Sequence, residues 1–300
     1  MNDLTVKTDY SSIIERFIQD QQISESSRVT YRSAIKVFFS FAESYPQLDK
    51  HVLLQYRQSL IDGNVSQSTV SLYITVVRVF FKWAESEGLT KDYARTIKGG
   101  KIDTRRFYKE PLTATQAKQL IEATENKRDR ALIILMLFTG IRRIEAVRAK
   151  VGDISNKGDK TVLWVQGKGH YEKDDFVKLE PIVLEAIGDY LSERGAKDGE
   201  PLFMSRAVNY KGQPLSAVSV TIIIKNYLRK IGIVSRKITA HSLRHTFVTL
   251  GLMAGVSLRN MQLEARHMNL ATTQRYAHDL DRMTNEATAS VVGAVYEAVA

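Results

Sequence analysis

Apolar residues recur every three or four positions over residues 10–98, the spacing of helices that bury one face. A turn cluster, Asp62-Gly63-Asn64, interrupts the pattern, and Gly88 is placed to cap its last helix. We therefore predict a helical domain over residues 1–98. Its apolar stripes and helical stretches cover residues 13–18, 31–42, 50–61 and 68–87.

Basic side chains line one face of two of these helices. Arg28, Arg32 and Lys36 recur every four residues, and Arg78 and Lys82 lie one turn apart. Such a face can lie along phosphates, which require only charge and reach, or it can be ordinary solvated surface. The spacing alone leaves both interpretations open.

Residues 99–110 break the helical pattern and are predicted to link two domains. Gly99 and Gly100 begin the segment, and basic residues outnumber acidic ones in and around it. This composition is typical of a flexible, cationic linker. The basic residues are Lys98, Lys101, Arg105, Arg106 and Lys109.

A second domain is predicted over residues 111–278, around one very apolar segment. Residues 131–138 are apolar on every side, which predicts a helix buried at the domain centre. Gly140 ends that helix, and Arg142 follows almost directly. An arginine on so rigid a support suits an active site, although a helix start is also a common place for a surface arginine.

The β-rich part of the chain lies between residues 153 and 179. Residues 161–165 and 175–179 are predicted strands, and Gly167-Lys168-Gly169-His170 between them is a tight turn that projects Lys168. By itself this pattern favours a plain turn with a solvated lysine. Because helices resume after it, the predicted fold class is mainly α with a small β-hairpin or sheet.

Composition narrows the possible functions. The 300 residues, 44% of them hydrophobic, can form two cores. The absence of cysteine rules out disulfides and thiolate nucleophiles. No apolar run approaches the roughly 20 residues needed to span a bilayer, and no signal-peptide pattern begins the chain, so a cytoplasmic protein is expected. The 43 Lys and Arg against 33 Asp and Glu favour a polyanionic partner.

Residues with chemical potential gather between His241 and Tyr276. His241 and Arg244 share a helix face, and the planar fork of arginine suits phosphate oxygens. Tyrosine becomes a nucleophile when cations favour its phenolate or a base accepts its proton. Alone, Tyr276 would be taken for a packing residue, and only its neighbours suggest a nucleophile. His241 and His245 could form a zinc pair, but no acidic residue lies between them, so no metal is predicted.

The order of these motifs resembles the tyrosine recombinase (phage integrase) family. Thr139-Gly140-Ile141-Arg142 with Glu145, Gly167-Lys168-Gly169, His241-Ser242-Leu243-Arg244-His245-Thr246, and His267 nine residues before Tyr276 match the family pattern. The match spans most of residues 111–278. The basic helical unit before it is similar to the family's core-binding domain, and the resemblance implies a C-shaped clamp around duplex DNA.

The resemblance also implies a role for each matching residue. Arg142 and Arg244 would bind the scissile phosphate, and His267 would donate a hydrogen bond to it. Lys168 would protonate the leaving 5′ oxygen, and His241 would act as acid and base for the tyrosine. Tyr276 would form a 3′-phosphotyrosyl bond that conserves the energy of the phosphodiester. No metal, cofactor or ATP is therefore implied.

Two positions depart from the family pattern. Ala265-Arg266 stands where the family usually has Leu-Gly, so an additional phosphate contact from Arg266 is expected. Arg143 replaces a residue that is usually apolar. Neither change touches the nucleophile or the two arginines of the motif.

The tail, residues 279–300, is acidic and then apolar, and a helix is predicted there. It could dock on its own domain, but the resemblance favours contact with a neighbouring protomer. The implied assembly is a homotetramer on two double-stranded DNA recombination sites, with accessory DNA-bending or directionality proteins as further partners. Such an enzyme is expected to be associated with the nucleoid.

The main hypothesis is a simple two-domain integrase of a mobile element or phage. A chromosome-dimer resolvase is the nearest alternative, and the missing Leu-Gly before His267 argues against it. A non-catalytic DNA-binding regulator would not require all six catalytic residue types. A type IB-like topoisomerase, which acts as a monomer, would not require an apolar tail.

Overall fold

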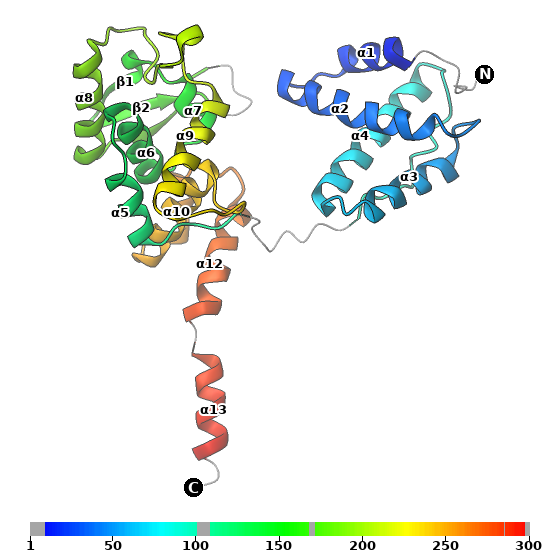
Figure 1. Cartoon of the computed structure of the whole chain (residues 1–300). Helices are drawn as coiled ribbons and strands as arrows, with labels where there is room; N and C mark the ends of the chain where they lie inside the picture. The colour runs from blue at the N-terminus through cyan, green and yellow to red at the C-terminus, as the bar shows by residue number, and fades with distance from the viewer. Residues whose placement is uncertain (1–9, 101–108, 168–171, 285, 298–300) are drawn as a thin grey trace. The chain divides into compact units, whose positions relative to one another are not determined.

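The chain folds into two compact units, residues 1–104 and 105–300. The computed structural model describes residues 10–100, 109–167, 172–284 and 286–297 (Figure 1). Most of these residues are helical, and a small antiparallel sheet completes the fold. The predicted fold class, mainly α with a small sheet, is confirmed.

Four α-helices make up the described part of the N-terminal unit. Serine or aspartate side chains cap three of them, at Ser24, Asp49 and Ser66, which explains where those helices begin. Their apolar faces meet in an aromatic core that includes Phe17, Phe38, Tyr56, Phe80 and Phe81. The helices are α1 (Tyr10–Asp20), α2 (Glu25–Ala42), α3 (Lys50–Asp62) and α4 (Gln67–Ser86).

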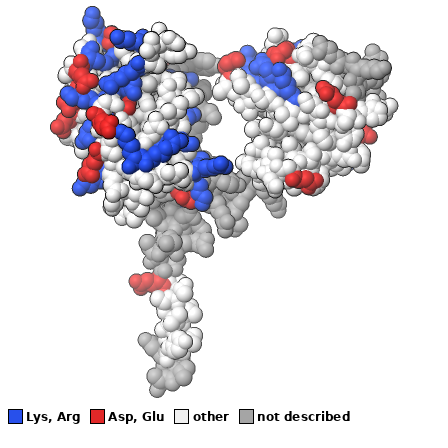
Figure 2. Space-filling view, viewed as in Figure 1, with Lys and Arg blue, Asp and Glu red and all other residues white. Residues whose placement is uncertain are grey.

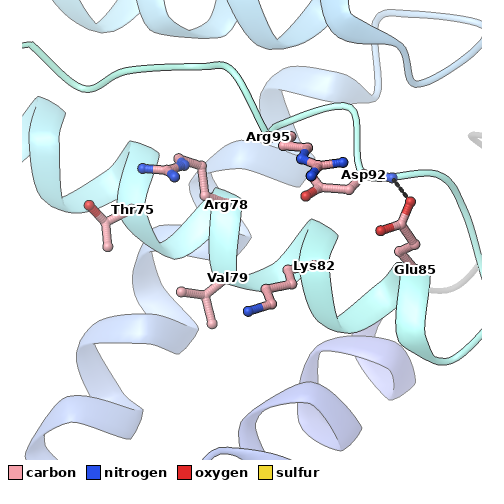
Figure 3. Close-up of a pocket in the computed structure, with 7 residues that line it drawn as sticks. All are labelled: Thr75, Arg78, Val79, Lys82, Glu85, Asp92 and Arg95. Carbon is pink, nitrogen blue, oxygen red and sulfur yellow. Dashed lines mark hydrogen bonds between the residues drawn. The ribbon is translucent and has the colours of Figure 1, made fainter.

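The two basic faces of this unit differ in their surroundings. On α2, Arg32 forms a two-point ion pair with Glu15 of α1, at 2.7 and 2.8 Å, so this arginine holds two helices together. On α4, Arg78 and Lys82 form no ion pair with any described residue, and with Arg95 they line a pocket (Figure 3). The α4 face thus has two cations available to a ligand, whereas Arg32 of the α2 face is already paired.

The second unit is built around a central helix, α6 (Lys127–Thr139). As its apolar sequence predicts, its side chains from Ala131 to Leu137 are buried, but Phe138 is 42% exposed. It packs against α8 and α10. The unit's other α-helices are α5 (Ala114–Glu122), α7 (Arg143–Arg148), α8 (Pro181–Arg194), α9 (Ala217–Lys230), α10 (Ala240–Met253), α11 (Leu258–Glu264), α12 (Leu270–Thr284) and α13 (Ala287–Glu297).

The sheet has one strand more than the predicted hairpin. β2 (Lys160–Val165) pairs antiparallel with β3 (Asp175–Lys178), as expected, and also with β1 (Ile154–Lys157). In the hairpin Leu163 lies opposite Val177, and both side chains are buried in the core of the unit. The hairpin tip, with Lys168, lies outside the described residues.

The C-terminal segment forms a short helix, α13, as predicted for the tail. Its apolar side chains Val291, Val292 and Val295 are at least half exposed. Within the described segments, no helix is both long and apolar enough to cross a membrane.

Candidate active site

Arg142 follows a tight turn at Gly140, where there is no room for a side chain. Gly140 ends α6 with a φ of 59°, in the left-handed region. A Cβ at this position would lie 2.4 Å from Cδ1 of Phe247, so close packing also excludes a side chain. Arg142 then lies at the N-cap position of α7, with its side chain about one-third exposed.

Glu145 holds Arg142 from one helical turn away. Its side chain is fully buried, and its two oxygens accept from the backbone N–H and from Nη1 of Arg142, each at 2.8 Å. Arg266 also donates to this carboxylate. The side chain of Arg266 is thus paired with Glu145. The sequence pattern had instead predicted that this side chain contacts a phosphate.

Arg244 is buried on α10, with 2% of its surface exposed. Its Nη1 donates to the carbonyl oxygen of Gly140 at 2.6 Å, and its Nη2 donates to that of Ala265. Burial and the cations of Arg142 and Arg266 lower its pKa. Because two carbonyl groups fix the guanidinium, its position is set before any substrate arrives.

Tyr276 lies on α12 within the same unit, only 6% exposed. Its ring packs in a small apolar cluster with Val248, Met261 and Ala265. Burial raises the pKa of the phenol, while the nearby charge of Arg244 opposes that shift. The resting tyrosine is therefore a neutral phenol held close to a cation.

Two histidine rings lie beside this tyrosine, and a third lies beside one of them. The His245 ring centroid lies 5.2 Å and that of His267 lies 6.3 Å from the Tyr276 ring, while His241 lies 4.7 Å from His245. Nδ1 of His267 is 2.9 Å from the hydroxyl of Thr273. The sequence pattern indicates no catalytic role for His245, although its four-residue spacing from His241 places the two rings together.

Two of the histidines are held neutral. Burial lowers the pKa of His245 to about 3, with further contributions from His241 and Arg244. Burial lowers the pKa of His267 to about 3 as well, followed by the charges of Arg244 and Arg142. At neutral pH both rings are therefore uncharged, and protonation of either ring inside the folded site is disfavoured.

These histidines predict that acid weakens the fold. Unfolded, each would take up a proton below its ordinary pKa of 6.5, whereas folded each stays neutral down to about 3. The contribution of these histidines to the free energy of unfolding is thus fully present above about pH 6.5 and is lost as the pH falls towards about 3. The loss is roughly 2 kcal/mol per histidine at about pH 5. Urea unfolding at about pH 7.5 and about pH 5 measures this difference.

A matched pair of variants assigns the pH effect. His245→Gln should reduce the difference in the free energy of unfolding between the two pH values by the amount that one histidine contributes. His51→Gln should not change this difference, because His51 is exposed on α3. A pH dependence that is unchanged in His245→Gln would contradict this assignment.

Five of the six predicted site residues thus lie in one neighbourhood, namely Arg142, His241, Arg244, His267 and Tyr276. The sixth, Lys168, lies outside the described residues.

Thr246 connects this region to the start of the unit, because its hydroxyl accepts a hydrogen bond from the N–H of Leu112 at 2.8 Å. No cluster of His, Cys, Asp or Glu suited to a metal ion occurs in the part of the chain that the structure describes. Figure 2 shows many Lys and Arg side chains on the visible face of the second unit, with Asp and Glu side chains among them.

Curated relatives are similar over most of the chain. The tyrosine recombinase XerA of Pyrococcus horikoshii is 33% identical over 202 residues, which cover 67% of this chain and 67% of the relative. The tyrosine recombinase XerC of Thermodesulfovibrio yellowstonii is 32% identical over 83% of this chain and 84% of its own.

Solved structures share the fold at lower identity. A XerH site-specific recombinase bound to palindromic difH substrate, in a post-cleavage complex, matches 94% of this chain and 84% of its own, with a TM-score of 0.75 and 22% identity. A lambda integrase tetramer bound to a Holliday junction matches 92% of this chain and 78% of its own, with a TM-score of 0.72 and 20% identity.

Two family models match the chain in tandem. The N-terminal SAM-like domain of phage integrases matches residues 14–88, and the phage integrase family model matches residues 110–283. The second match alone covers more than half of the chain. The chain therefore belongs to the phage integrase family, the tyrosine recombinases that cut and rejoin DNA at specific sites.

Proposed function

We propose that this recombinase cuts each DNA strand with its own Tyr276. The supporting observation is the placement of that phenol, on α12 of the same unit as Arg244 and the rings of His245 and His267. The phenol oxygen attacks the phosphorus and forms a 3′-phosphotyrosyl bond, while the bond to the 5′ oxygen breaks. A 5′ hydroxyl of the partner strand then attacks this bond and releases the tyrosine.

The neighbouring cations stabilise the charge that this attack creates. Arg142 and Arg244 bind the nonbridging oxygens, where negative charge develops. His267 donates a hydrogen bond to the phosphate, and His241 takes and returns the phenol proton. Lys168 supplies the proton that the leaving 5′ oxygen requires. Every proton is thus transferred by a side chain, as the family pattern implies.

Duplex DNA is the proposed partner of both units, in the clamp that the sequence resemblance implies. In the N-terminal unit the contact is assigned to the α4 face, because Arg78, Lys82 and Arg95 gather there (Figure 3). The nearby acidic residues, Glu85 and Asp92, leave this face a net positive charge. The α2 face is the weaker candidate, since Arg32 is already paired with Glu15.

The proposed active assembly is a tetramer on two duplexes. Support comes from α13, whose valines at 291, 292 and 295 are exposed and so available to a neighbouring protomer. The related lambda integrase is seen as a tetramer on a Holliday junction. Residues 279–300 would then form the contact between protomers, with residues 99–110 as the linker between the two DNA-binding domains.

Two biological roles fit this chemistry. The departure from Leu-Gly before His267 favours the integrase of a mobile element or phage. The relatives named XerA and XerC favour a resolvase of chromosome dimers. The position of the recombination site distinguishes the roles, because an integrase acts at the ends of its element and a resolvase at one chromosomal locus.

Capture of covalent protein–DNA species from the host tests both the proposed chemistry and the proposed action at one recombination site. We expect sequencing of the linked DNA to show one short site, and a nicked duplex with that site to give a species that survives a denaturing gel. Retarded DNA without a covalent species would indicate a regulator. Linkage with no preference of site would indicate a topoisomerase.

A further inference from the structure

The turn between α11 and α12 has an unusual residue at its centre. Arg266 has a φ of 53°, a left-handed conformation that side chains disfavour and glycine accepts. Its N–H donates to the carbonyl of Leu263 at 2.9 Å, and the N–H of His267 donates to that of Gln262 at 3.0 Å. These two bonds form a Schellman motif, in which glycine is the usual residue at this position.

This turn presents three successive carbonyl groups to side chains of the site. Arg244 donates to the carbonyl of Ala265, and Nη2 of Arg142 donates to that of Arg266 at 3.2 Å. Nε2 of Gln262 donates to the carbonyl of His267 at 3.0 Å. The left-handed backbone therefore helps to orient both guanidinium groups that are assigned to the phosphate.

The Arg266 side chain makes a second set of contacts, with two carboxylates. Only 6% of it is exposed, and it donates to Glu145, the carboxylate that also holds Arg142. Its Nε lies 3.3 Å from a carboxylate oxygen of Asp175 on β3. One side chain thus connects the turn, α7 and the sheet.

The charges show what this side chain adds. Among the described residues, three guanidinium groups, those of Arg142, Arg244 and Arg266, face the two carboxylates of Glu145 and Asp175. Without Arg266 the cations and anions would be equal in number, and Arg142 would be the one guanidinium of the three still paired directly with Glu145. A glycine could form the turn but could not supply this charge.

We propose that Arg266 is a positioning residue for DNA cleavage. Its backbone holds the guanidinium groups of Arg142 and Arg244 in place, and its side chain shares Glu145, so that Arg142 keeps charge for the phosphate. This inference rests on the proposed role of the two arginines at the scissile phosphate. It differs from the phosphate contact expected from sequence, because Arg266 acts through Glu145.

The test is a set of single-turnover cleavage measurements on a nicked duplex, at saturating protein. Arg266→Gly keeps the turn and removes the charge, and we expect cleavage about 10- to 100-fold slower, less than the ~10²- to 10³-fold loss for a direct donor. The dissociation constant for DNA should change much less. Arg266→Lys, which restores the charge but not the fork, should recover part of the rate.

A double variant separates positioning from direct contact. If Arg266 acts by sharing Glu145, then Arg266→Gly with Glu145→Gln should cleave faster than Arg266→Gly alone, since an ionised Glu145 no longer offsets the charge of Arg142. Failure of Glu145→Gln to restore any rate would overturn the proposal, and so would an unchanged rate in Arg266→Gly. Absence of covalent product from the unaltered protein would instead contradict the proposed function.

A matched control accounts for effects of the backbone. Asn64, in the N-terminal unit, is the other non-glycine residue with a positive φ in the described segments, at 55°. Asn64→Gly should leave the cleavage rate unchanged. If Arg266→Gly does not fold, Arg266→Gln, which also removes the charge, takes its place in both the single and the double variant.

Discussion

Tyr276→Phe is expected to abolish covalent attachment to DNA and to leave DNA binding close to that of the unaltered protein. The substitution removes the attacking oxygen and keeps the ring, which packs against Val248, Met261 and Ala265. Because these apolar contacts persist, the fold and the cation cluster should persist with them. A denaturing gel measures the covalent species, and a gel-shift titration measures binding.

Tyr210→Phe is the matched control for this experiment. Tyr210 lies between α8 and α9 and is 65% exposed, so the same loss of one phenol oxygen removes nothing from the site. It should form the covalent species at the normal rate. Covalent species in Tyr276→Phe, or their loss in Tyr210→Phe alone, would show that another tyrosine is the nucleophile.

Arg244→Ala is expected to slow cleavage by about 10²- to 10³-fold, the cost of removing one fixed donor from a developing oxyanion. The guanidinium is buried and held by the carbonyls of Gly140 and Ala265, so no other side chain can take its place. Its loss also leaves two buried carbonyl groups without their donor, at about 1–3 kcal/mol of stability each. Arg244→Lys should restore little, because one ammonium cannot reach both carbonyls and a phosphate.

The cleavage rate and the dissociation constant are measured together for this variant. Arg206→Ala removes the same charge from an exposed position, where Arg206 pairs with Glu193 at 3.3 Å, and should affect neither quantity strongly. Equal losses of cleavage and binding in Arg244→Ala would mean that Arg244 only positions DNA.

Helical periodicity was sufficient to predict much of the fold. The stripes of α1 to α4 and the all-round apolar segment of α6 each correspond to one strong, local pattern. The motif from His241 to Thr246 is also local, because residues three and four apart share a helix face. These features could be predicted since each depends on neighbours within a few turns.

Other features depend on contacts between distant residues. β1 is four residues long and mostly exposed, so it has no alternating pattern to reveal it. The destination of the Arg266 side chain depends on Glu145, 121 residues earlier in the chain. Its left-handed backbone could be suspected only from the family's usual glycine. Such facts require the folded chain, because no local spacing encodes them.

The central claim is that a single phenol oxygen, on α12 beside Arg244, becomes joined to DNA. The most direct measurement is to digest the covalent species with protease and nuclease and to identify the joined peptide and DNA end by mass spectrometry. We expect Tyr276 joined to a 3′ phosphate, with a free 5′ hydroxyl on the other DNA end. A different residue in the joined peptide, or linkage to a 5′ phosphate, would contradict the account.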